Sequence, residues 1–143
     1  MKLETLEEMW SIDSKIDRSS LDAESLKIPE LHQKYYKLYL REKFQFKSDE
    51  NMYNQFFKLK HEYYTGKLSS EELKEFGWEP FQFVLKGDLQ IYLDADKEIC
   101  ERLLKLEIQK EKIRFLESII ENLNRRSFSI KNAIEFIKFS NGI

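Results

Sequence analysis

The sequence predicts an all-α protein. Lysine, glutamate, leucine and isoleucine dominate its 143 residues, and only four glycines and two prolines interrupt them. That composition is typical of helices that pack as bundles or coiled coils. Apolar residues also recur every three or four positions over long stretches, which is the period of an amphipathic helix. The length suits one domain with a modest core.

Charge is segregated along the chain although its net value is only −2. Residues 1–26 carry −4, residues 27–67 carry +4, residues 68–98 carry −5 and residues 99–143 carry +3. The central and C-terminal segments are therefore the ones that would attract a polyanion. Solvated helices also show such segregation by chance, so charge alone does not decide the function.

Cysteine content and hydropathy indicate the compartment. The single Cys100 excludes an internal disulfide and is compatible with a reducing cytosol. No N-terminal apolar run resembles a signal peptide, and no stretch approaches the roughly 18 apolar residues of a membrane span. We expect a soluble, cytoplasmic protein with no membrane partner.

The first element expected is an amphipathic helix over residues 3–16. Leu3, Leu6 and Ile16 are spaced for one face. This helix either docks on the body of the protein or offers its acidic side to a basic partner protein. The acidic side carries Glu4, Glu7 and Glu8.

A long helical region follows from Pro29 to about residue 65, after a short helical piece that begins near Ser19. It is one helix or two, because the polar residues 47–51 contain no strong breaker. A basic ridge runs along its first half at i, i+3 and i+7. Such a ridge can follow a phosphate backbone, although charged ridges often face only water. Its members are Lys34, Lys37 and Arg41.

Residues 56–66, Phe-Phe-Lys-Leu-Lys-His-Glu-Tyr-Tyr-Thr-Gly, form the densest aromatic block. On a helical wheel the apolar face here spans roughly 160°, wider than the ~100° stripe that one core covers. Lys60 falls within this face, whereas Lys58 lies nearly opposite. A cation among rings suits an unstacked base and its phosphate. The same spacing is typical of core or subunit contacts, with the lysine reaching to water.

The segment over residues 68–93 is the least regular. Ser69 and Glu72 have the spacing of a capping box for a helix to about Phe76. Residues 81–93 then read either as a small hairpin around a Lys-Gly-Asp turn or as a short-helical or irregular connector. We favour the connector.

Two further helices are expected near the C-terminus, over residues 94–125 and 129–140. Spacings of three and four residues favour a coiled-coil or bundle seam. Little else in the chain is available to cover these stripes, so we expect them to pack against copies of themselves in a homo-oligomer. The residues assigned to that contact are Leu103, Leu106, Ile113, Leu116, Ile120, Leu123, Ile130 and Ile134.

Catalytic and metal-binding signatures are missing from the sequence. His32 and His61 are isolated from other ligand residues. Asp94 and Asp96 could hold a divalent ion, as in a nuclease, but helix capping explains carboxylates at this place. Cys100 lies on the apolar side of its helix, where we expect a buried, inert thiol. No phosphate-binding, dinucleotide or nucleophile motif occurs. We expect no enzyme, no catalytic residue, no cofactor and no metal.

Four blocks of the sequence, in order and with similar spacing, resemble the bacteriophage UvsY recombination mediators. They are Met1–Leu6, Lys58–Gly66, Ala95–Glu98 and Arg126–Lys131. The Tyr-Tyr-x-Gly block with its upstream basic pair and the Ala-Asp-Lys block are the more specific parts. The likeness runs nearly end to end.

This resemblance implies a small, mainly helical protein that forms a hexamer- or heptamer-like ring through its C-terminal part. Family members bind single-stranded DNA, loosen the phage single-strand DNA-binding protein and help load the phage RecA-like recombinase, without enzymatic activity. The cytoplasm of an infected bacterium is the implied location. Residues 1–143 would form one helical domain. Within it, residues 1–67 would bind DNA, 68–93 connect and 94–143 oligomerise.

The family's basic pair before Tyr-Tyr-x-Gly corresponds to Lys58 and Lys60 here. The family pattern has arginine at the second position, and lysine keeps the charge but loses the planar, bidentate fork. The predicted DNA-binding residues are Lys58, Lys60, Tyr63 and Tyr64, together with Lys34, Lys37 and Arg41 of the ridge.

Overall fold

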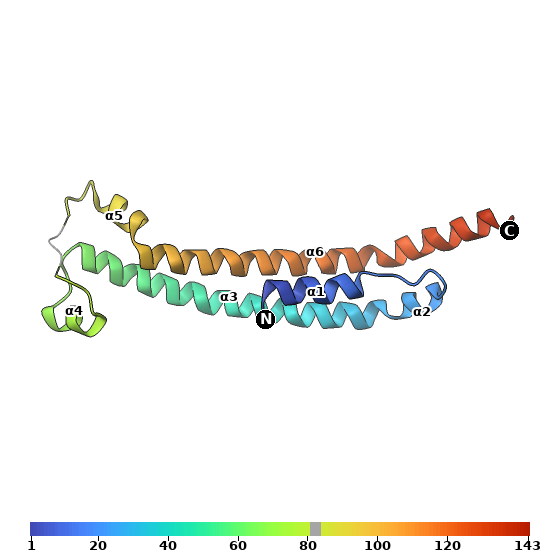
Figure 1. Cartoon of the computed structure of the whole chain (residues 1–143), viewed down its shortest axis with the longest axis horizontal. Coiled ribbons are helices and arrows are strands. Elements are labelled where there is room, and N and C mark those ends of the chain that lie inside the picture. Colours follow the sequence, from blue (N-terminus) through green and yellow to red (C-terminus); the bar gives the residue numbers. More distant parts are fainter. Residues whose placement is uncertain (81–83) are drawn as a thin grey trace. The chain divides into compact units, whose positions relative to one another are not determined.

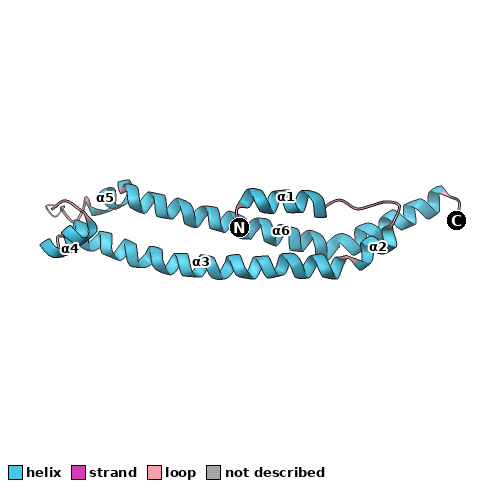
Figure 2. Ribbon diagram, turned by 60° about the horizontal axis from the view of Figure 1, so that its bottom comes forward, coloured by secondary structure: helices cyan, strands magenta, loops and turns pink. Residues whose placement is uncertain are grey.

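The computed structural model describes residues 1–80 and 84–143, and six helices account for the regular structure of these residues (Figure 1). Over the same ranges no strand occurs, as Figure 2 shows, and the predicted all-α class is confirmed. No helix in the described part of the chain is both long and apolar enough to cross a bilayer. The helices are α1 (Leu3–Asp13), α2 (Leu21–Leu26), α3 (Ile28–Tyr64), α4 (Ser70–Phe76), α5 (Leu89–Ala95) and α6 (Lys97–Ser140).

The chain divides into two compact units. Unit 1 comprises residues 1–44 and 110–143, and unit 2 comprises residues 45–109. Unit 1 thus holds α1, α2, the first part of α3 and the last part of α6. Unit 2 holds the end of α3, then α4, α5 and the beginning of α6.

The core of unit 1 is mainly aliphatic and also buries the ring of Tyr35. Within this unit α1 lies beside the unit's parts of α3 and α6 (Figure 1). The buried residues of α6 follow one another at intervals of three and four, so one stripe of the helix faces the core. The buried cluster consists of Leu6, Tyr35, Leu116, Ile119 and Leu123.

A polar cluster fixes the end of α1 in unit 1. The Asp13 carboxylate accepts hydrogen bonds from the Tyr35 hydroxyl and from Lys34 Nζ, both at 2.7 Å. Arg126, which is buried, donates from Nη2 to the Asp13 carbonyl at 3.0 Å. Since Tyr35 and Arg126 come from α3 and α6, the cluster ties three helices together.

The core of unit 2 is smaller and rich in aromatic rings. Its buried members are Phe56 of α3, Leu93 of α5 and Ile99 of α6. Half-buried side chains, most of them aromatic, surround these three residues. They are Tyr53, Phe57, Tyr64, Trp78 and Leu89.

Both long helices are continuous. Residues 29–65, which the sequence left open as one or two helices, belong to the single helix α3. The prediction of separate helices over 94–125 and 129–140 was wrong, because α6 runs unbroken from Lys97 to Ser140. The residues between the expected helices include no glycine or proline, and buried Arg126 and Ile130 keep this part of α6 packed in unit 1.

The predicted capping box of α4 is confirmed. Ser69 Oγ accepts from the Glu72 amide, and the Glu72 carboxylate accepts from the Ser69 amide, both at 3.2 Å. The helix ends at Phe76, and Gly77 follows with φ of 70°. That left-handed conformation is one that glycine adopts without steric cost.

The short-helical connector expected over residues 81–93 is confirmed for the described residues 84–93. Residues 81–83 lie outside the described residues. Residues 86–88 form a turn, and α5 begins directly after it at Leu89. The described part of this stretch is therefore a short-helical connector and not a hairpin.

Candidate nucleic-acid interface

The end of α3 carries the side chains that the sequence analysis singled out. The helix stops because Gly66, with φ of 72°, takes the left-handed conformation. The Gly66 amide donates to the Tyr63 carbonyl at 3.2 Å and the Lys67 amide to the Glu62 carbonyl at 2.9 Å. This paired pattern is a Schellman C-cap, and it fixes where the last turn of α3 points its rings.

Lys60 is buried in unit 2, with only 4 % of its surface exposed. Its ammonium lies 3.1 Å from Asp96 Oδ2 and 3.1 Å from Glu98 Oε1. Asp96 is buried as well, whereas Glu98 is half exposed. A buried cation requires such partners, since an unpaired charge in a low-dielectric interior is strongly unfavourable.

Aromatic rings enclose the remaining sides of the Lys60 ammonium. The ring centroids of Trp78, Tyr63 and Phe56 lie 4.2, 5.5 and 5.8 Å from Nζ. All three distances fall within the reach of a cation–π attraction. Tyr63 in turn donates its hydroxyl to the Glu79 carbonyl at 2.8 Å, which holds the chain next to Trp78 against α3.

Asp96 is bonded on several sides at the start of α6. Its Oδ1 accepts from the Ile99 amide at 2.9 Å, which caps α6, and its Oδ2 accepts from the Tyr64 hydroxyl at 2.6 Å. Burial by itself would raise the pKa of Asp96, but the hydrogen bonds from Tyr64, Ile99 and Lys60 outweigh it and lower that pKa. The carboxylate therefore stays ionised and remains a permanent partner for Lys60.

The hydrogen bond that lowers the pKa of Asp96 has the opposite effect on Tyr64. Burial and the hydrogen bond to the Asp96 carboxylate both raise the pKa of the Tyr64 hydroxyl. Its proton is therefore retained at physiological pH, and Tyr64 acts as a donor. The two tyrosines predicted to bind DNA thus have their hydroxyls engaged within unit 2.

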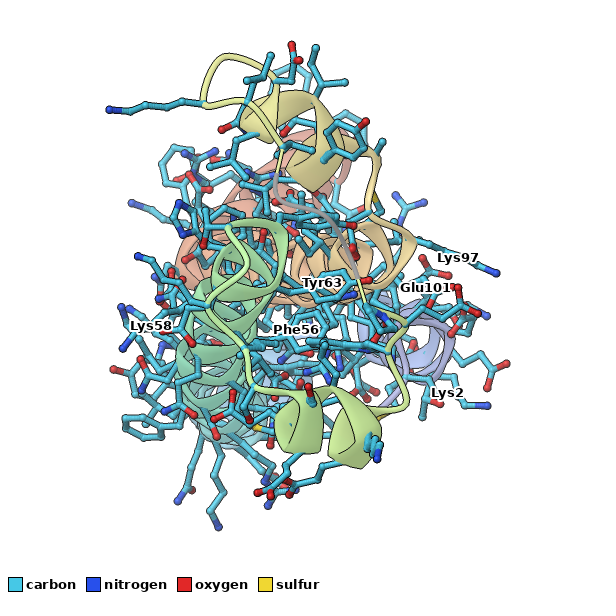
Figure 3. The ribbon with its side chains drawn as sticks, turned by 90° about the vertical axis from the view of Figure 1, so that its left-hand side faces the viewer. Lys2, Phe56, Lys58, Tyr63, Lys97 and Glu101 are labelled. Atoms are coloured by element: carbon cyan, nitrogen blue, oxygen red, sulfur yellow. The ribbon has the colours of Figure 1, made fainter. Side chains whose placement is uncertain are left out.

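Lys58 has the opposite environment. It is exposed and points outward, away from Phe56 and Tyr63 (Figure 3). Within the described part of the chain no ion pair involves its ammonium. Of the two lysines that the sequence pairs, Lys58 is the one that a solvated phosphate reaches without rearrangement.

Exposed rings adjoin the cluster around Lys60 in unit 2. Phe76, at the end of α4, is 41 % exposed, and its ring centroid lies 4.9 Å from that of Trp78. Tyr92 of α5 is 42 % exposed and lies 5.9 Å from Tyr64. Sequence reasoning missed Phe76, Trp78 and Tyr92, because only folding brings them to the α3 end. Their aromatic character in an irregular segment was the available signal.

An open groove of about 440 Å³ lies beside the Lys60 ion pairs in unit 2. The Arg102 guanidinium lies over the Phe56 ring at 3.9 Å on this side. The lining carries three carboxylates against two cations, so it does not favour an anionic ligand. It consists of Asp49, Met52, Tyr53, Glu98, Glu101, Arg102, Lys105 and Leu106.

The basic ridge predicted on α3 lies in unit 1 and is only partly available. Lys34 is paired with Asp13 at 2.7 Å and lies 5.4 Å from the Tyr35 ring. Lys37 and Arg41 are exposed. All three cations of the ridge are exposed, but Lys34 is paired with a carboxylate of its own unit.

The residues assigned to oligomerisation fall into two groups. Leu106 is buried in unit 2, whereas Leu116, Leu123 and Ile130 are buried in unit 1, so the chain's own fold covers all four. Ile113 and Ile120 are half-buried, and Leu103 and Ile134 are exposed. Beyond Ile134 the end of α6 exposes further large apolar side chains. These are Phe136, Ile137 and Phe139.

The candidate metal and thiol residues have ordinary surroundings. Asp94 accepts from Gln90 at 2.7 Å, and Asp96 caps α6. In the described ranges no group of three or more histidine, cysteine or acidic side chains is arranged to hold a metal ion. The expectation of a buried Cys100 was wrong, because its thiol is exposed beside the start of α6 and contacts the Asp94 carbonyl.

Comparison with known proteins identifies the relatives of this chain. Residues 9–143 match the model of the family described as "Recombination, repair and ssDNA binding protein UvsY". Comparison with curated proteins gives no match. Two crystal structures of the bacteriophage T4 recombination mediator protein UvsY have a similar fold. Lattice type IV is 22% identical, with a TM-score of 0.84 over 97% of this chain and 99% of that one. Lattice type II is 21% identical, with a TM-score of 0.85 over 99% and 98%.

Proposed function

Because this chain belongs to the UvsY family of recombination, repair and single-stranded-DNA-binding proteins, we propose that it is a non-enzymatic recombination mediator. It binds single-stranded DNA as a homo-oligomer and helps to load a phage RecA-like recombinase onto DNA covered by single-strand DNA-binding protein. The observation that carries this proposal is that unit 2 exposes both a cation and aromatic rings. There an exposed lysine, Lys58, lies in the same unit as partly exposed aromatic rings.

This combination of cation and ring suits a single strand and not a duplex. Unstacked bases expose their faces, and stacking on an aromatic side chain stabilises binding by about 1–3 kcal/mol per base whatever the sequence. An exposed lysine contributes by releasing counterions from the phosphates, which makes binding weaken as salt rises. Phe76 and Tyr92 supply rings, and Lys58 supplies charge.

The ridge in unit 1 adds phosphate contacts. Lys37 and Arg41 are exposed cationic side chains. Lys34 is paired with Asp13, so it contributes only when a phosphate displaces that carboxylate. We therefore rank Lys37 and Arg41 above Lys34 as contacts.

Oligomerisation multiplies weak sites into useful affinity. Linked sites bind one strand with an effective concentration that raises the overall affinity by orders of magnitude without any new contact. The apolar side chains exposed at the end of α6 support a contact between copies there, since monomers rarely expose so many together. A hexamer or heptamer would repeat the Lys58 surface six or seven times. The exposed members are Ile134, Phe136, Ile137 and Phe139.

Binding along a repeated surface also suggests how a mediator would act. A strand bent around the oligomer would fit its covering protein less well, and the recombinase could then occupy the released bases. This role requires no bond to be made or broken. It is consistent with an interface built from lysines and rings alone.

The test is a titration of labelled oligo-dT with the purified chain at several salt concentrations, combined with light scattering. We expect an oligomer that binds the strand more weakly as salt rises. A single subunit that ignores the strand at low salt would rule the proposal out. Lys58→Met should weaken binding, whereas Lys15→Met, an exposed lysine outside the proposed surface, should leave it unchanged.

A second function, a structural oligomeric scaffold without nucleic-acid binding, is favoured by one observation. The Lys60 ammonium and the Tyr64 hydroxyl are satisfied inside unit 2 and need no ligand. The scaffold predicts that light scattering finds an oligomer but that oligo-dT does not bind at any salt concentration. The same two measurements therefore separate the two functions.

A further inference from the structure

The two lysines that precede the Tyr-Tyr-x-Gly block have different roles in this chain. We infer that Lys60 is a positioning residue that holds the ring cluster of unit 2 together and does not touch the strand, whereas Lys58 makes the phosphate contact. This inference rests on the proposed single-strand binding. It assigns to Lys60 a role opposite to the one that its sequence position suggests.

Burial is the first argument. Only 4 % of the Lys60 surface is exposed, and two carboxylate oxygens already lie 3.1 Å from its ammonium. A phosphate would have to replace two negative charges, one of them buried with the lysine. Removing one partner from a buried pair leaves an uncompensated charge, which is strongly unfavourable.

The enclosing rings are the second argument. The Trp78 centroid lies 4.2 Å from Nζ, and the rings of Tyr63 and Phe56 stand within 6 Å. Together with the two carboxylates, these rings leave Lys60 only 4 % exposed. Direct access of a phosphate would therefore require Trp78 to move away, together with the chain that Tyr63 bonds at Glu79.

The position of Lys60 between three segments is the third argument. Lys60 lies on α3, Trp78 follows α4, and Asp96 and Glu98 begin α6. One ammonium thus joins elements that are distant in the sequence. Because Phe76 stacks against Trp78, the exposed ring offered to a base depends on the same ammonium.

Lys58 lacks every one of these features. It is exposed, and Figure 3 shows it pointing outward from the end of α3. Residues two positions apart on an α-helix point to nearly opposite sides. Because Lys60 faces the core of unit 2, Lys58 must face solvent. The Lys58 ammonium is therefore available to a phosphate.

Salt dependence separates a phosphate contact from a positioning role. For single strands, each phosphate–lysine contact contributes about 0.7 to the slope of log K against log salt concentration. We expect Lys58→Met to flatten the slope by at least that amount with no change in melting temperature. We expect Lys60→Met to bind oligo-dT several-fold more weakly while the slope of log K against log salt concentration stays unchanged. Its melting temperature should be several degrees lower. Lys60→Arg, which keeps the positive charge, should bind oligo-dT and melt like the unmodified chain.

A flatter slope for Lys60→Met, equal to that of Lys58→Met, would overturn the inference and leave single-strand binding intact. If no form of the chain binds oligo-dT, the proposed function fails instead. In that case, the melting temperatures of Lys60→Met and the unmodified chain still show whether Lys60 stabilises unit 2. Lys15→Met serves as the control for loss of an exposed positive charge.

Asp96→Asn provides a test that keeps the lysine in place. If Lys60 contacted phosphate, removing the competing carboxylate would tighten binding and steepen the salt slope. If Lys60 only positions the rings, the slope stays unchanged and the affinity stays equal or falls. This variant decides the question even if Lys60→Met does not fold, because the asparagine oxygen can still accept from Ile99.

Discussion

The two units of this chain hold themselves together in different ways. Unit 1 is closed by aliphatic side chains of three helices, among them Leu6, Leu116 and Leu123, which have at most 1 % of their surface exposed. Unit 2 has fewer buried apolar residues and surrounds a paired lysine, Lys60, with aromatic rings. In unit 1 the charged cluster around Asp13 lies beside a mainly aliphatic core, whereas in unit 2 the paired charge of Lys60 lies among the rings of the core itself.

The two kinds of core differ in the groups that they leave available for a ligand. Aliphatic burial is non-directional and leaves no polar group to interact with a ligand. A ring cluster around an ion pair keeps polar and aromatic groups at defined positions near the surface. The proposed strand binding therefore draws its rings from unit 2, and unit 1 contributes the exposed ridge on α3.

The largest effect is expected from truncation in the aliphatic core. Leu116→Ala should lower the free energy of unfolding by about 2–5 kcal/mol, because it leaves a cavity in a fully buried cluster. Urea unfolding followed by circular dichroism would measure it. Leu26→Ala is the matched control, since Leu26 is 82 % exposed and should cost less than about 0.5 kcal/mol. Equal losses for the two variants would refute the contrast between core and surface.

The next prediction concerns how the stability contributed by Asp96 depends on pH. The pKa of Asp96 lies below its usual value of 3.8, because its hydrogen bonds outweigh the opposing effect of burial. A carboxylate whose pKa is depressed by folding contributes stability above the unfolded pKa and loses it as pH falls through the folded pKa. We expect Asp96→Asn to destabilise the chain by about 1–3 kcal/mol at pH 7. At lower pH the difference from the unmodified chain should shrink.

Thermal unfolding at pH 7, 4 and 3 would measure this dependence. Asp13→Asn is the counterpart in unit 1, because burial raises the Asp13 pKa but the hydrogen bonds from Lys34 and Tyr35 lower it overall. A difference between Asp96→Asn and the unmodified chain that stays constant from pH 7 to pH 3 would mean that Asp96 is not linked to folding.

The smallest effect compares two matched hydroxyl groups. Tyr35 donates to Asp13 in unit 1 at 2.7 Å, and Tyr64 donates to Asp96 in unit 2 at 2.6 Å. We expect Tyr35→Phe and Tyr64→Phe each to cost about 1 kcal/mol or somewhat more, because each acceptor is ionised. Only Tyr64→Phe should also weaken strand binding. Urea unfolding and the oligo-dT titration measure both, and an equal loss of binding in the two variants would contradict the division of roles.

Local patterns in the sequence predicted most of the helices. The spacing of apolar residues located α1 and the long helices, and Ser69 with Glu72 marked the start of α4. These features depend on residues within one or two turns of each other. The predicted break near residue 126 failed because no local breaker is present, and the packing of Arg126 and Ile130 carries α6 through it.

The candidate site was predicted only in part. The block at 56–66 identified both lysines and the rings of α3, but it did not identify Trp78 or show which lysine is exposed. The partners of Lys60 lie 36 and 38 positions further along the chain, at Asp96 and Glu98. A helical wheel has no information about such distant groups.

The helical class, the capping of α4 and the opposite orientation of Lys58 and Lys60 can be predicted from the amino-acid sequence alone. All three depend on the geometry of one turn of backbone. The enclosure of Lys60 by carboxylates and rings is visible only in the folded chain, because burial depends on which distant segments pack together. The chain's own cores likewise cover Leu116 and Leu123, which periodicity alone had assigned to contacts between copies. Periodicity specifies that a face is apolar, and packing specifies what covers it.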